Sequence, residues 1–132
     1  MKTHLNPPGV SAPAAPYSHQ VMVAGAVRWL AVSGQLGQNG DGSVPEAPLD
    51  QLALALANVS VNLEAAGMSV ADLIKVTIFV TVPTESAERR RRLEAWLGPH
   101  RPAMTLVQVA GLAAPQFSVE VEAWACQDEP IS

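Results

Sequence analysis

The side chains best suited to acid–base chemistry are two glutamates near the C-terminal end of the chain, Glu120 and Glu122. They alternate with valine and alanine in strand-forming sequence, so both carboxylates lie on one face of the expected strand. A carboxylate there can position a water or move a proton, provided that burial raises its pKa into a useful range. The alternative is a solvated or ion-paired glutamate. The alternation of the strand does not decide which of the two glutamates is the functional one.

Tyr17 and the Ser33–Gly34 dipeptide are the next candidates. A phenol offers a hydrogen-bond donor together with an apolar wall. A glycine allows the backbone to approach a ligand closely and exposes its amide donors. The alternatives are a tyrosine that only packs against the first strand and an ordinary turn at the end of a strand.

The remaining reactive side chains predict no site. His19 can titrate near neutral pH, but a lone histidine at the start of a strand is more often structural. His4, His100 and Cys126 lack the spacing of metal ligands, so we expect no metal site. Cys126 also has no neighbouring histidine or aspartate in the sequence that would make it a nucleophile.

Composition narrows the class of protein. The chain has 132 residues, which suits one domain over residues 1–132. Its net charge of −4 argues against a nucleic-acid partner, which would require a basic surface. No apolar run is long enough to cross a membrane, and the proline-rich start does not resemble a secretory signal. A single cysteine suits a reducing compartment, so we expect a cytoplasmic protein.

Hydrophobic periodicity predicts the elements that must position these residues. Residues 1–16 are rich in proline and alanine and predict an extended lead-in. Residues 20–23 and 27–33 predict a hairpin around Gly25, and 73–82 a central strand ended by Pro83. Residues 49–66 repeat apolar side chains at helical spacing, and Gly67 marks the helix end. The last two strands are expected over 104–109 and 118–125.

A second helix is expected from a Thr84 cap to about Leu97, before Gly98–Pro99. Its basic run, residues 89–92, predicts a solvated helix surface, with i,i+4 pairs of Glu85 with Arg89 and Glu88 with Arg92.

The predicted order is therefore β-β-α-β-α-β-β, an α+β fold with two helices on one face of a mixed sheet. If the valine sides of the last two strands face the helices, the second face carries Met104, Leu106 and Trp124. That face is too apolar to lie in water. The pattern consequently predicts a homo-oligomer.

Six motifs, in order from about Pro16 to Ala125, resemble the RidA (YjgF/YER057c) family. They are Pro16-Tyr17-Ser18, Val32-Ser33-Gly34-Gln35, Gln51 with Ala57-Asn58, Leu63-Glu64-Ala65-Ala66-Gly67 followed by Asp72-Leu73-Ile74-Lys75-Val76-Thr77, Pro102-Ala103, and Val119-Glu120-Val121-Glu122-Ala123. Each motif is weak alone, but their order and spacing together are specific. The resemblance implies a chorismate-mutase-like fold, assembled as a homotrimer with clefts between subunits.

The resemblance also implies an activity and a site. Deaminases of the family hydrolyse imines and enamines, such as 2-aminoacrylate, to keto acids and ammonia, without metal or organic cofactor. It assigns Tyr17, Ser33 and Glu120 to catalysis, and Gly34, Met104 and Leu106 to substrate binding. It favours Glu120 over Glu122. A small-molecule substrate is the expected partner, with no nucleic acid and no membrane.

Met104 is the main departure from this pattern, because family deaminases carry a carboxylate-binding arginine there. A thioether cannot make that contact, and Leu106 makes the site more apolar still. Either the substrate lacks this carboxylate, or another cation binds it, with Arg28, Arg101 and Lys75 as candidates. We therefore expect an imine- or enamine-directed enzyme that is not a general 2-aminoacrylate deaminase. The alternative is a non-catalytic trimer that binds an apolar ligand or a protein partner.

Overall fold

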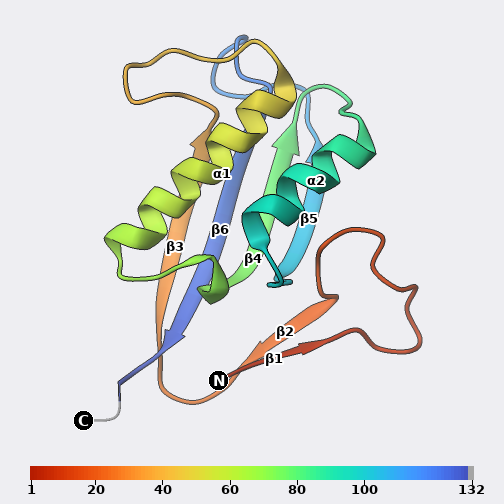
Figure 1. Ribbon diagram of the computed structural model, residues 1–132, viewed down its shortest axis with the longest axis vertical. Coiled ribbons are helices and arrows are strands. Elements are labelled where there is room, and N and C mark those ends of the chain that lie inside the picture. The colour runs from red at the N-terminus through yellow and green to blue at the C-terminus, as the bar shows by residue number, and fades with distance from the viewer. Residues whose placement is uncertain (131–132) are drawn as a thin grey trace.

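A four-stranded mixed sheet forms the centre of the computed structural model, which describes residues 1–130 (Figure 1). Its strand order is β3 (Val27–Leu36), β6 (Val119–Asp128), β4 (Leu73–Val80) and β5 (Ala103–Gln108). The pair β4–β5 is parallel, while β3–β6 and β4–β6 are antiparallel. Strands β3 and β5 therefore form the two edges of the sheet.

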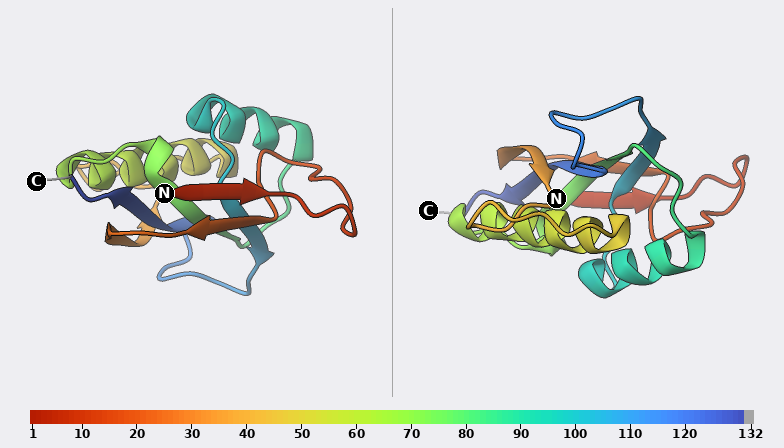
Figure 2. Two further views of the ribbon diagram at one scale, coloured as in Figure 1. Left: turned by 90° about the horizontal axis from the view of Figure 1, so that it is seen from below. Right: turned by 90° about the horizontal axis from the view of Figure 1, so that it is seen from above.

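Two helices, α1 (Pro48–Ala65) and α2 (Ser86–Leu97), cover one face of this sheet (Figures 1 and 2). The predicted α+β class, with two helices and a mixed sheet, is confirmed. Each strand next to a helix alternates buried and less buried residues, as expected for a sheet with one covered face. No helix among residues 1–130 has the length and hydropathy needed to cross a membrane.

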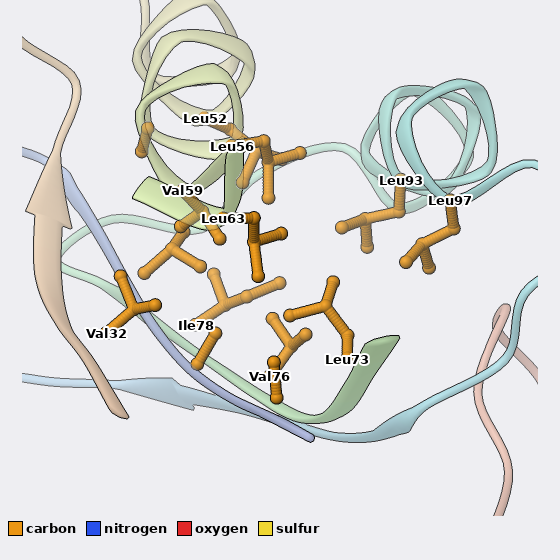
Figure 3. Close-up of a cluster of buried hydrophobic side chains, with 14 of the residues drawn as sticks. Val32, Leu52, Leu56, Val59, Leu63, Leu73, Val76, Ile78, Leu93 and Leu97 are labelled. Atoms are coloured by element: carbon orange, nitrogen blue, oxygen red, sulfur yellow. The ribbon is translucent and has the colours of Figure 1, made fainter. Parts of the chain in front are cut away.

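The apolar stripe predicted for the first helix forms the centre of the core. Leu56, Val59 and Leu63 are at most 2% exposed and point toward Val76 and Ile78 of β4 (Figure 3). The helix ends at Ala65, and Gly67 follows its C-cap with a φ of +71°, which only glycine readily adopts. There the Met68 amide donates to Leu63 O and the Gly67 amide to Glu64 O, which is a Schellman motif.

The N-terminal region differs from its prediction. Residues 2–5 form a strand, β1 (Lys2–Leu5), within the expected lead-in. It pairs antiparallel with β2 (Gln20–Val23), so the predicted hairpin of residues 20–23 with 27–33 is wrong. At Gly25, with φ +92°, the chain turns away, and β3 pairs with β6 instead. The two-stranded β1–β2 sheet is tied to the domain by Lys2 Nζ, which donates to Cys126 O.

The second helix begins one residue later than predicted, because Glu85 and not Thr84 provides its N-cap. The Glu85 carboxylate accepts from the amides of Ala87 and Glu88, so it does not pair with Arg89. Arg89 donates instead to Thr84 O and Oγ1. The predicted Glu88–Arg92 pair is also wrong. Glu88 pairs with Arg91, and Arg92 with Asp50 of α1.

The sheet face without helices carries a different set of residues from the predicted one. The valine side of β6 faces the helices as expected, but β5 is turned the other way. Met104 pairs with buried Val76 and packs against the core, while Thr105 lies on the open face and accepts from Lys75 Nζ. The open face is still apolar, since Trp29 and Trp124 are 54% and 48% exposed. The prediction of an oligomer thus loses Met104 and Leu106 as an argument but keeps Trp124, and the structure adds Trp29.

Candidate functional site

Glu120 lies on the open face of β6, directly against Gly34 of β3. A Cβ built on Gly34 would stand 2.0 Å from Glu120 Oε1 and 2.7 Å from its Cδ. Only glycine leaves this space, so position 34 is matched to the carboxylate. Glu120 forms no hydrogen bond or ion pair with any of residues 1–130, and its half-buried side chain keeps its oxygens accessible. Such a carboxylate is free to accept a proton or hold a water.

Ser33 and Gly34 form a bulge in β3. The register with β6 shifts between Val32 and Gln35, so two residues lie opposite one. Bulges re-aim side chains and backbone groups, and they are frequent beside active sites. Ser33 is exposed, and its carbonyl accepts from the side chain of Gln35 at 2.9 Å. The bulge lies on an edge strand, where backbone groups are free to meet a ligand or a second chain.

Glu122 lies one step further along β6, opposite the bulge and paired with Thr77. It is half-buried like Glu120, but none of the atoms nearest to Gly34 belongs to it. Phe79 pairs with Glu120 from the other side and supplies an apolar neighbour. Sequence reasoning missed Phe79, because only the register between β4 and β6 brings it there.

Tyr17 lies at the other side of the molecule, in the segment between β1 and β2. Its amide donates to Ala15 O at 2.8 Å, and its ring packs edge-on against His19, with ring centroids 5.4 Å apart. The amide of Ser18 donates to Pro102 O, and its hydroxyl to Arg101 O. These bonds hold Tyr17 beside the start of β5, since Pro102 lies two residues before Met104 in the sequence.

Met104 and Leu106 lie on the helix-facing side of β5. Met104 is half-buried against the core, and Leu106 is 39% exposed at the sheet edge. The six predicted site residues therefore form two groups in one chain. Ser33, Gly34 and Glu120 lie at the β3 side, and Tyr17, Met104 and Leu106 at the β5 side.

These two groups are too far apart to form one site within a single chain. Met104 aligns through Val76 with Ala123, which is three residues from Glu120. At about 3.3 Å per residue and about 4.8 Å per strand, they are separated by roughly 10 Å in each direction. They also lie on opposite faces of the sheet. Glu120 and Met104 therefore lie toward opposite edges of the sheet and do not meet within one chain.

The three cations suggested as replacements for the missing arginine are engaged elsewhere. Arg28 donates to the side chain of Gln127. Arg101 donates to the carbonyls of Gly98 and His100. Lys75 donates to Thr105 on the open face, opposite to Met104. Among residues 1–130, no group of three or more His, Cys, Asp or Glu is arranged to hold a metal ion.

Comparison with known proteins decides the family. The family described as endoribonuclease L-PSP matches residues 9–127 of this chain. The chain belongs to this YjgF/RidA family. TdcF of Escherichia coli is 36% identical over 85 residues, which cover 62% of this chain but only 65% of TdcF, less than two thirds of its length. The 2-iminobutanoate/2-iminopropanoate deaminase of the same species is 35% identical over 98 residues, 71% of this chain and 76% of that protein.

Solved structures agree with this assignment. A Rid-family protein from Yersinia pestis, YyfB, superposes with a TM-score of 0.81 at 26% identity, covering 96% of this chain and 98% of that one. E. coli TdcF with bound serine superposes with a TM-score of 0.68 at 31% identity, covering 88% and 91%. This member of the RidA family therefore has the overall fold of its relatives while carrying Met104.

Proposed function

We propose that this chain hydrolyses a small imine or enamine to a carbonyl compound and ammonia, with water as the nucleophile. The names of its relatives as imine deaminases support this reaction class. The observation that carries the proposal is the unpaired carboxylate of Glu120. It occupies the space that a side chain at position 34 would need, so only glycine fits there. A purely structural role leaves unexplained why this accessible carboxylate forms no hydrogen bond or ion pair with residues 1–130.

The reaction needs one proton-transferring group. Glu120 removes a proton from water as the oxygen attacks the imine carbon, and the C=N bond becomes C–N in a carbinolamine. The protonated Glu120 returns this proton to nitrogen, which completes the carbinolamine. Glu120 then takes the hydroxyl proton and passes it to nitrogen as the C–N bond breaks, so that ammonia leaves, the carbonyl forms and the carboxylate is regenerated. The Tyr17 phenol and the backbone at Ser33–Gly34 hydrogen-bond the substrate. An enamine first takes a proton on carbon and loses one from nitrogen, which converts it to the imine.

The complete site requires a second copy of the chain. Because the two half-sites lie at opposite edges of the sheet, the β3 edge of one copy must approach the β5 edge of the next. Such a contact joins two different surfaces, and repeating it gives a ring when the rotation from one copy to the next closes after a whole number of copies. We propose a homotrimer, as the resemblance implies, in which Glu120 of one subunit and Tyr17 and Met104 of its neighbour line each cleft.

Imine hydrolysis with 2-aminoacrylate generated in solution tests this proposal. The variants are Glu120→Gln, which is nearly isosteric but cannot move a proton, and Met104→Arg. We expect a slow or absent native reaction with 2-aminoacrylate, a gain in Met104→Arg, and loss of that gain when Glu120→Gln is added. A broader panel of imines with no carboxylate on the imine carbon should include substrates that the native protein turns over and that Glu120→Gln slows at least about 100-fold.

Two results would contradict the proposal. Native turnover of 2-aminoacrylate at a rate typical of the deaminases would show that Met104 does not limit the substrate. Inactivity of the native protein and of Met104→Arg toward the whole panel, with both variants folded by circular dichroism, would favour the non-catalytic binding protein.

A further inference from the structure

Arg90 is distinct among the charged side chains of this chain. Of the eight lysines and arginines, the other seven each donate to a carboxylate, carbonyl, amide or hydroxyl oxygen of residues 1–130. Arg90 donates to none of them. The run of residues 89–92 is thus not a uniform solvated surface. Arg89, Arg91 and Arg92 each donate a hydrogen bond to an oxygen of residues 1–130, and Arg90 does not.

Arg90 borders a cavity of about 380 Å³ between the start of α2 and the segment that precedes Tyr17. Its lining consists of Ala14, Ala15, Ser86, Arg89, Arg90 and Leu93. The size falls within the range of about 300–1,000 Å³ typical of small-molecule sites. Two alanines and a core leucine give it an apolar wall, while two guanidinium groups and a hydroxyl supply donors only for an anion or another acceptor.

This cavity adjoins the β5 half of the site. Ala15 accepts from the amide of Tyr17, so one turn joins the cavity wall to the predicted catalytic tyrosine. Ser18 then fastens this turn to Arg101 and Pro102, just before Met104. Leu93 and Met104 contribute to the same apolar core on the helix side of the sheet. The free guanidinium and the position of the missing arginine thus lie on one side of the sheet.

The local charge favours an anion. The cavity lining contains two arginines and no acidic residue, and the carboxylate of nearby Glu85 is occupied in capping α2. Arg89 donates to Thr84 and contributes positive charge to the cavity wall. Arg90 has all five of its N–H donors available. A guanidinium with free donors binds a carboxylate through two parallel hydrogen bonds.

We propose that Arg90, supported by Arg89, binds the carboxylate of the substrate in place of the absent arginine at position 104. This rests on the proposed function and deepens it. Arg90 extends from the helix layer and not from β5, so the anion it binds lies farther from the strand. The substrate class is therefore an imine whose carboxylate is separated from the imine carbon by a spacer, unlike 2-aminoacrylate, in which the two are adjacent.

Binding of keto-acid products tests this without turnover. Levulinate, with a spacer between its ketone and carboxylate, is titrated by NMR into the native protein, Arg90→Gln and Arg91→Gln, with its neutral methyl ester and pyruvate as comparisons. Arg91→Gln is the matched control, because it removes the same charge one residue away from an arginine paired with Glu88. We expect Arg90→Gln to weaken levulinate binding about tenfold or more and Arg91→Gln about twofold at most.

The comparison ligands complete the test. The ester should bind weakly and equally to all three proteins, and pyruvate more weakly than levulinate to the native protein. Equal levulinate affinity in native and Arg90→Gln, or no binding to the native protein, would overturn the role of Arg90. Pyruvate binding as tight as levulinate would overturn the spacer. Arg90-dependent levulinate binding without turnover of any imine would instead refute the catalytic function and leave the anion site standing.

Discussion

Replacing Gly34 with alanine tests whether Glu120 must occupy the position seen here. The new Cβ would stand 2.0 Å from Glu120 Oε1, and contacts below 3.0 Å are essentially never observed. The oxygen must therefore retreat by about 1 Å or more. A displacement of that size at a reacting group costs roughly 100-fold in rate. We expect kcat on the best imine of the panel to fall by about this factor.

The same substitution should hardly change stability. The obstructing atoms are at the end of a side chain that can change rotamer, at a cost of about 0.5–1.5 kcal/mol. Replacing glycine also removes conformational freedom from the unfolded chain, which offsets about 0.4–1 kcal/mol. The free energy of unfolding, measured in urea, should change by less than about 1 kcal/mol.

Two other glycines serve as controls. Gly40→Ala meets nothing within 4 Å and should leave both rate and stability unchanged. Gly37→Ala places its Cβ 2.5 Å from Gln51 O, a backbone atom that cannot move aside, and should destabilise the fold by about 1–3 kcal/mol. If Gly34→Ala keeps native kcat, Glu120 does not act from this position and the proposed site is wrong.

Three further predictions concern the fold and its assembly. Gln51→Leu should cost about 2–4 kcal/mol in urea unfolding, because buried Gln51 bonds Pro45 O, Gln116 O and the Ser118 amide; a loss below about 1 kcal/mol would show that these bonds are dispensable. Burial lowers the pKa of His100 from 6.5, so the neutral form is favoured on folding and stability should fall as pH drops below about 6.5; His100→Gln should flatten this slope, and an unchanged slope would contradict the assignment. Trp124→Glu places a charge opposite Ala31 on the open face and should convert a native trimer, measured by sedimentation, into smaller species; a trimer of unchanged stability would show that this face is not an interface.

Local sequence patterns determined most of the elements of this protein. The first helix was predicted within a residue of its observed ends because its apolar stripe and terminal glycine act over a few residues of chain. The central strand and the helix-facing side of β6 were predicted for the same reason. The order of motifs also indicated the family, and Met104 was visible as a departure from its pattern.

Local sequence patterns did not determine which strands pair with each other. Whether residues 20–23 pair with β1 or β3 depends on contacts between distant segments, as does the side of the sheet toward which Met104 points. Glu85 took the N-cap that Thr84 was expected to provide, so it did not pair with Arg89, which bonds Thr84 instead. The other predicted pair was replaced by a contact between helices, since Arg92 pairs with Asp50 of α1.

The site shows the same division. The types of its residues could be read from the sequence, but their separation to opposite edges of one sheet could not. Strand order and register alone set the roughly 10 Å offsets and the opposite faces of Met104 and Glu120. Likewise, only packing distinguishes Arg90 from its three basic neighbours, because a cavity and a free guanidinium are properties of the folded chain.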